Sequence, residues 1–116
     1  MSWTNDVDDV AVLFCTVPNA EVGARVAHAV VDASEAACVN IIPGLRSIYR
    51  WRGETCDDAE LLLVMKTTRS RCEELSRHVK AMHPYETPEL VALPVEAGSL
   101  AYLDWVRGET RPPQVG

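Results

Sequence analysis

The stretch CVNIIPGLRSIYRWRGETCDDAELLLVMKT (residues 38–67) predicts two long β-strands joined by a polar reversal. Both arms are rich in β-branched, aromatic and large aliphatic residues, which fit a pleated and half-buried surface. Gly53-Glu54, together with Asp57-Asp58, is expected to supply the turn between them. Pro43-Gly44 interrupts the first arm, which a regular central strand would not tolerate, so we expect a bulge or bend there.

This hairpin is longer than a domain of this size can cover. As one extended arm, residues 38–51 span about 45 Å at about 3.3 Å per residue. A compact domain of this size has a radius of gyration of about 13 Å and a diameter of roughly 35 Å. The distal side chains Ile48, Tyr49 and Trp51 should therefore extend beyond the core. A second copy of the chain is the simplest cover for them, so we expect an oligomer whose interface contains these three residues.

Composition indicates one soluble domain. The chain has 116 residues, of which 47% are hydrophobic and 24% charged, and its net charge is −6. The scattered Lys and Arg residues form no basic face, which argues against nucleic acid as a partner. The apolar runs are too short for a membrane span, and the first residues do not resemble a signal peptide. Four cysteines stand far apart without a CxxC pair, so we expect reduced thiols and a cytoplasmic location.

The chain on either side of the hairpin predicts three helices and two further strands. Hydrophobic runs predict strands over residues 10–17 and 88–95. Apolar residues at three- and four-residue steps predict a helix over 21–37, with Asn19 as its N-cap and Glu35 on its polar face. The second helix should begin at a capping box, Ser70-x-x-Glu73, place Cys72, Leu75, Val79 and Met82 on its buried side, and end at His83-Pro84. The third should begin at Ser99, bury Leu100, Leu103 and Val106, and stop at Gly108.

The resulting order β-α-β-β-α-β, with a terminal helix, predicts an α+β fold of the ferredoxin-like type. In that fold an antiparallel four-stranded sheet carries both helices on one face. We expect a loose N-terminus over residues 1–9, one domain over 10–107 and a flexible tail over 108–116. The other sheet face is then open, and with the long hairpin it points to self-association.

Cys15, Met82 and His83 are the residues with the chemistry to hold a soft metal. Cys15 lies in the middle of the first strand, and His83 ends the second helix directly after Met82. A thiolate, an imidazole and a thioether together favour Cu(I) over Mg²⁺ or Ca²⁺. For each residue alone a structural role is the stronger interpretation: a buried thiol, a core methionine and a histidine that bonds a backbone carbonyl.

A second polar group surrounds the loop that starts at Tyr85-Glu86. Loops with many polar residues carry function more often than strands do, although solvated turn residues explain this loop about equally well. Lys66 follows the apolar run LLLVM, so its ammonium group must reach solvent or pair with a carboxylate such as Glu86 or Glu89. A site made of Lys66, Tyr85, His83 and these glutamates would bind a small anion or polar ligand. An interfacial salt bridge is the alternative, and we favour it slightly.

Catalytic signatures are absent from the sequence: it has no P-loop, no GxGxxG and no HExxH. A Cys15 nucleophile with His83 as its base is the enzymatic alternative, and it requires a depressed thiol pKa. We expect a protein that is not an enzyme.

Five stretches resemble the CutA family of divalent-cation tolerance proteins: LFCTVPN (13–19), EAACVNIIPGLRSIYRWRGE (35–54), LLLVMKTT (61–68), HPYETPELVALPV (83–95) and YLDWV (102–106). The resemblance covers about residues 10–107. It implies a ferredoxin-like subunit in a tight homotrimer, akin to PII-type signal transducers, whose long hairpins pair with neighbouring subunits.

The resemblance also implies a link to copper tolerance and copper binding, without an enzymatic activity. The ligands attributed to the family fall here on Cys15 and His83, while Met82 stands where the family has another histidine. Trp51, Lys66, His83, Tyr85 and Glu89 match positions that line an intersubunit cleft. We therefore expect a cytoplasmic trimer that binds copper or another divalent cation. The alternatives are a PII-like small-molecule sensor and a scaffold that presents its surface to a partner.

Overall fold

The computed structural model describes residues 3–4 and 9–112. The elements are β1 (Trp3–Thr4), β2 (Val10–Val17), α1 (Ala20–Asp32), β3 (Cys38–Trp51), β4 (Glu54–Thr68), α2 (Arg69–Met82), β5 (Val91–Pro94), β6 (Gly98–Ser99) and α3 (Leu100–Glu109). In the described part of the chain, β2 to β5 form one antiparallel sheet in the order β3-β4-β2-β5, and β1 pairs with β6. The predicted ferredoxin-like order is confirmed.

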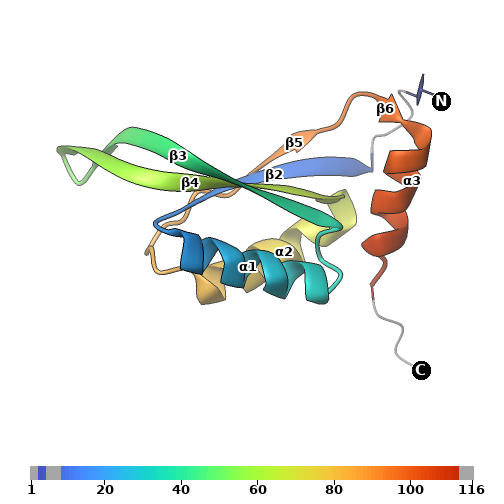
Figure 1. Cartoon of the computed structure of the whole chain (residues 1–116), viewed down its shortest axis with the longest axis horizontal. Helices are drawn as coiled ribbons and strands as arrows, with labels where there is room; N and C mark the ends of the chain where they lie inside the picture. Colours follow the sequence, from blue (N-terminus) through green and yellow to red (C-terminus); the bar gives the residue numbers. More distant parts are fainter. Residues whose placement is uncertain (1–2, 5–8, 113–116) are drawn as a thin grey trace.

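Both α1 and α2 cover the same face of the sheet, whereas α3 stands at the end opposite the hairpin tip (Figure 1). Side chains alternate along β2 from Ala11 onward, so that the odd-numbered residues are buried against the helices and Val12, Phe14 and Thr16 are only half-buried. We call the side away from α1 and α2 the open face. The register places Val12 and Phe14 of β2 opposite Leu93 and Val91 of β5, so all four belong to this face.

The hairpin of β3 and β4 is as long as predicted and extends past the helices (Figure 1). The molecule is consequently elongated, with principal extents of 46 × 35 × 22 Å. The predicted irregularity is confirmed, because the register shifts between Ile42 and Leu45 and Gly44 has a φ of +83°. The predicted turn is wrong in position: Arg52 and Gly53 form it, both with positive φ, as a tight hairpin loop requires.

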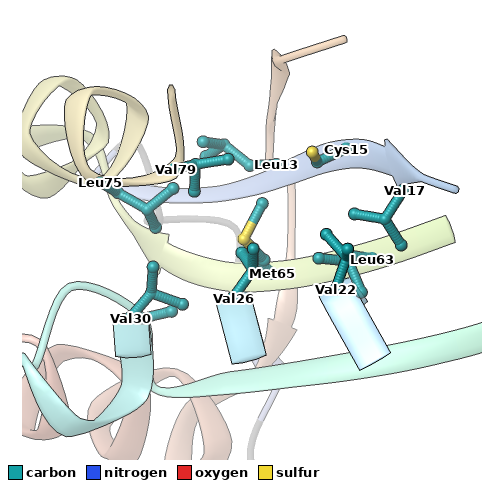
Figure 2. Close-up of a cluster of buried hydrophobic side chains, with 11 residues drawn as sticks. Leu13, Cys15, Val17, Val22, Val26, Val30, Leu63, Met65, Leu75 and Val79 are labelled. Atoms are coloured by element: carbon teal, nitrogen blue, oxygen red, sulfur yellow. The ribbon is translucent and has the colours of Figure 1, made fainter. Parts of the chain in front are cut away.

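The core lies between the sheet and the two helices, and its centre comes from the stretch of residues 38–67. Leu63 and Met65 of β4 are fully buried beside Val17 of β2 and Val26 and Val30 of α1 (Figure 2). Leu75 and Val79 of α2 are buried in the same cluster, with Cys72 and Met82 packed against it, as the helix periodicity predicts. A smaller cluster holds α3, in which Leu103 and Val106 pack with Val10 and Ala37.

The first helix ends earlier than its apolar periodicity predicts. The Asn19 side chain accepts a hydrogen bond from Val22 N at 2.9 Å, which confirms the N-cap. The helix stops at Asp32, and Ser34 then adopts a φ of 57°, which reverses the chain. Glu35 therefore lies outside the helix. It is buried rather than solvated, with its carboxylate 2.6 Å from Nδ1 of His78.

The second helix also starts differently from the prediction. Its N-cap is Thr68, and no side-chain cap bond is formed, so the expected Ser70–Glu73 capping box is wrong. Arg71 in its first turn is buried, with 3% of its surface exposed. The guanidinium donates to the carbonyl oxygens of Ala33 and Ser34, at the end of α1. A residue that periodicity alone places on a polar surface thus joins the two helices.

The remaining boundaries differ in detail. The last sheet strand covers Val91–Pro94 rather than 88–95. In α3 the predicted inward residue Leu100 is 39% exposed, and the helix continues through Gly108 to Glu109. The short strand at Trp3–Thr4 falls in the segment expected to be loose, whereas residues 1–2, 5–8 and 113–116 of the two expected flexible ends lie outside the described residues.

Candidate functional site

Cys15, the first predicted metal ligand, is part of the core. Its side chain is fully buried among Leu13, Val17, Leu63 and other aliphatic residues (Figure 2). Burial raises the pKa of the thiol to about 12, and the negative charges of Glu89 and Glu60 contribute to this. A thiol with this pKa is protonated at neutral pH in the metal-free chain, whereas a nucleophile must be a thiolate.

His83 has both ring nitrogens engaged within the chain. Nε2 lies 2.8 Å from the carbonyl oxygen of Thr16, to which it donates. Nδ1 accepts a hydrogen bond from Tyr85 N at 3.1 Å. These two contacts fix the tautomer and leave no ring lone pair free for a metal ion. His83 therefore joins the end of α2 to β2, and it orients the start of the polar loop.

The three predicted ligands Cys15, Met82 and His83 are engaged in packing or hydrogen bonds within the single chain. Met82 packs against the same core cluster that contains Cys15. Within residues 3–4 and 9–112, no group of three or more His, Cys, Asp or Glu side chains is placed to hold a metal. The residues that carry soft-metal chemistry in the sequence are thus used for packing and for backbone hydrogen bonds.

Alkylation of the folded protein tests this assignment of Cys15. We expect iodoacetamide to modify Cys15 far more slowly than Cys56, which is partly exposed near the hairpin turn. Between pH 7 and pH 9 the rate at Cys15 should stay low, because its raised pKa keeps the thiol protonated throughout this range. Peptide mass mapping gives the modification at each site. Rapid modification of Cys15 in the native state would restore the enzymatic alternative.

The second predicted group does come together around a pocket. A cavity of about 780 Å³ lies beneath the distal half of the hairpin, and we call it the hairpin pocket. Residues 84–89 line it, including the predicted Tyr85, Glu86 and Glu89, and Trp51 lines it from β3. A volume of this size is typical of small-molecule sites rather than of single ions.

The hairpin pocket also contains residues that the sequence did not single out. Glu60 of β4 is 6% exposed and accepts a hydrogen bond from the Tyr85 hydroxyl at 2.8 Å. Arg52, at the hairpin turn, pairs with Glu86 of the loop at 2.6 Å. The sequence feature that could have identified Glu60 is its position directly before the run LLLVM. Strand alternation places it on the same sheet face as Leu62 and Val64.

The phenols of the pocket are held in their neutral form. Burial raises the pKa of Tyr85, and its hydrogen bond to Glu60 adds to this effect. The hydrogen bond to Asp58 raises the pKa of Tyr49 to about 12. Both rings therefore present uncharged aromatic surfaces beside carboxylates.

Lys66 lies away from this pocket. Its register partners are Val12 on β2 and Cys38 on β3, near the opposite end of the sheet from the hairpin tip. The ammonium group donates to Oδ1 of Asn40. The predicted pairing of Lys66 with Glu86 or Glu89 is therefore not formed within the chain.

The predicted interface residues are exposed as expected. Ile48 is 65% exposed, Tyr49 42% and Trp51 40%. The open face adds Ile42, Val91 and Leu93 to the exposed large apolar side chains. Several large apolar side chains exposed on one region of a protein indicate an interaction site.

The sequence of this chain matches a known protein family. The model of the CutA1 divalent ion tolerance protein family matches residues 11–109. This chain is a member of the CutA1 family. The family is thus one of divalent-ion tolerance, and the predicted resemblance is confirmed.

Relatives of this CutA1 chain include bacterial, plant and animal proteins. The divalent-cation tolerance protein CutA of Thermus thermophilus is 54% identical over 99 residues, which cover 85% of this chain and 96% of the relative. Protein CutA of Homo sapiens is 46% identical over 101 residues, or 87% of this chain and 56% of that protein. The chain spans 63% of the rice relative, named CutA 1, chloroplastic, so the match to these longer proteins is partial.

Solved CutA structures share the fold. CutA from Synechococcus elongatus superposes with a TM-score of 0.88 at 34% identity, covering 95% of this chain and 96% of that one. The crystal structure of CutA1 from Oryza sativa gives a TM-score of 0.87 at 46% identity, covering 90% and 96%. The long hairpin and the two-layer arrangement are therefore features of the family.

Proposed function

We propose that this CutA1 chain acts in divalent-ion tolerance as a homotrimer, in which neighbouring copies cover the hairpin and the open face. The observation that carries the proposal is the exposed apolar surface. Ile48 extends from β3 beyond the helices, and Val91 and Leu93 line an edge strand of the open face. Association would remove this surface from water at a gain of roughly 25 cal/mol per Å². The apolar surface supports association, and the number three is taken from the family resemblance.

We further propose that the ion is bound by donors from more than one chain. The described residues of one chain offer no group of three His, Cys, Asp or Glu side chains, so in this proposal a neighbouring copy supplies further donors. Glu86 and Glu89 are exposed carboxylates beside the hairpin, where such a neighbour would lie. Carboxylate oxygens suit hard divalent cations, whereas copper prefers sulfur and imidazole. Manganese therefore suits these carboxylates best, and copper, which the family resemblance implies, and zinc are tested beside it.

The proposed location is the cytoplasm, and the proposal includes no chemical transformation. All four cysteines are free, which suits a reducing compartment. None of the helices within the described residues is long and apolar enough to cross a membrane.

The mass and metal content of the purified native protein test this function. Native mass spectrometry at micromolar concentration should give three chains. After dialysis against copper, zinc or manganese, elemental analysis should find bound metal in the trimer and none in a dissociated variant. A folded wild-type monomer would contradict the assembly. A trimer that retains none of the three metals would contradict the ion site.

The hairpin pocket favours a second function, a PII-like small-molecule sensor or signalling scaffold. The pocket is present within one chain, and a buried carboxylate and three aromatic residues line it. Thermal shift separates the two functions, since a ligand that binds only the native state raises the melting temperature. Stabilisation by an organic compound in the presence of a chelator supports the sensor, whereas stabilisation by metal alone supports ion binding.

A further inference from the structure

Glu60 is a buried carboxylate without a cationic partner in the described chain. It is 6% exposed, it lines the hairpin pocket, and the Tyr85 hydroxyl donates to its Oε2 at 2.8 Å. The ion pairs among residues 3–4 and 9–112 all involve other carboxylates. Buried charges in proteins are normally paired or bound to a metal, because an isolated charge is costly to remove from water. The pocket therefore has an unmatched negative charge.

Part of the wall around Glu60 is aromatic. Tyr49, Trp51 and Tyr85 line the same cavity. A cation placed over the face of such a ring is attracted by its quadrupole, most strongly over tryptophan. Aromatic rings beside carboxylates are the combination that recognises organic cations, whereas a bare metal ion needs several oxygen, nitrogen or sulfur donors.

Arg52 shows this recognition within the chain itself. Its guanidinium carbon lies 5.4 Å from the centroid of the Trp51 ring, and the same group pairs with Glu86 at 2.6 Å. One organic cation is thus already bound by an aromatic ring and a carboxylate of the pocket. Glu60 and Glu89 line the same cavity, and neither takes part in an ion pair with another described residue.

We propose that the hairpin pocket binds a small organic cation with a primary ammonium or guanidinium group, which pairs with Glu60 and Glu89 against the aromatic walls. With three carboxylates and one arginine, the lining is net negative. A diamine suits this charge, and a cavity of about 780 Å³ accommodates one where a single metal ion would leave most of the space to water. The inference rests on the second function above, a ligand pocket, and it requires that a neighbouring copy leave this pocket open, since Tyr49 and Trp51 are also predicted interface residues.

Calorimetric titration with putrescine and with methylguanidine tests the proposal, with the chelated protein in a buffer of fixed ionic strength. We expect binding of at least one of these cations, with 1,4-butanediol as the uncharged analogue that does not bind. Glu60→Gln keeps the shape and the acceptor for Tyr85 but removes the charge, so it should weaken binding about tenfold or more. The matched control is Glu73→Gln, an exposed carboxylate on α2, which should bind like the wild type.

Glu89→Gln gives a second measurement that does not depend on a buried substitution, because Glu89 is exposed. A clear loss of affinity in Glu89→Gln, with native circular dichroism, supports the site even if Glu60→Gln folds poorly. Three results would overturn the proposal: no binding of either cation at millimolar concentration, equal binding of the diol, or unchanged affinity in both pocket variants. Native mass and metal content are measured on the same samples, so a failure of the trimer or of the ion site is detected separately.

Discussion

Replacing Ile48 with lysine is expected to convert the proposed trimer into folded monomers. Ile48 is 65% exposed in the single chain, so the substitution leaves the core intact. Its cross-strand neighbour Asp57 already pairs with Arg46 at 2.6 Å, so in the free chain a lysine at position 48 simply extends into water. In an interface the same ammonium group would be buried among apolar side chains without a matched partner, at a cost of several kcal/mol. Native mass spectrometry and light scattering measure the outcome.

Val31→Lys is the matched control for this prediction. Val31 is also an exposed large apolar residue, 40% exposed, but it lies on α1, on the opposite side of the molecule from the open face. A lysine in the last turn of a helix interacts favourably with its dipole, so the fold should be unaffected. The control should keep the wild-type mass. If Ile48→Lys also keeps it, the hairpin is not the surface that neighbouring chains cover.

Replacing Leu63 with alanine is expected to lower the free energy of unfolding by about 3 kcal/mol. Leu63 is fully buried at the centre of the sheet, opposite Cys15 on β2 and Ile41 on β3. The loss combines the transfer free energy of the removed methyl and methylene groups with the cost of the cavity that remains. Close packing limits relaxation here, because Leu63 belongs to a cluster in which Val17, Val22 and Val26 are also buried.

Urea unfolding followed by circular dichroism measures this loss. The measurement is best made in the Ile48→Lys background, because the unfolding free energy of an oligomer depends on protein concentration. Leu100→Ala serves as the control: this leucine is 39% exposed on α3, and alanine is the best helix former, so the change should stay below about 1 kcal/mol. A loss at Leu63 no larger than that at Leu100 would contradict the placement of the core.

The two candidate sites differ in how well the sequence predicts them. Tyr85, Glu86 and Glu89 occur within five residues in one loop, so any fold that exposes this loop brings them together. Trp51 meets them because the hairpin lies over the loop, which strand order and length already indicate. The metal set combined Cys15 with residues far away in sequence, and its donor atoms are committed to the core and to backbone carbonyls.

The roles of Glu60, Arg52 and Arg71 depend on contacts between distant segments. Arg52 reaches Glu86 across 34 positions, and Arg71 bonds carbonyl groups at the end of α1. A hydrophobicity pattern records which residues prefer water but not which partner a charged side chain finds. The partners of charged side chains are therefore what the pattern does not predict.

The sequence alone predicted four features of this protein: the element order, the ferredoxin-like class, the irregularity at Pro43-Gly44 and the excess length of the hairpin. These features depend on local periodicity and on segment length, and both can be read from the sequence without knowing any long-range contact. Only the tertiary structure showed that Cys15 is buried in the core, that both ring nitrogens of His83 are hydrogen-bonded, and that Glu60 lines a pocket without forming an ion pair among the described residues. Such outcomes depend on which polar atoms meet after packing, and that is a property of the whole chain rather than of any segment.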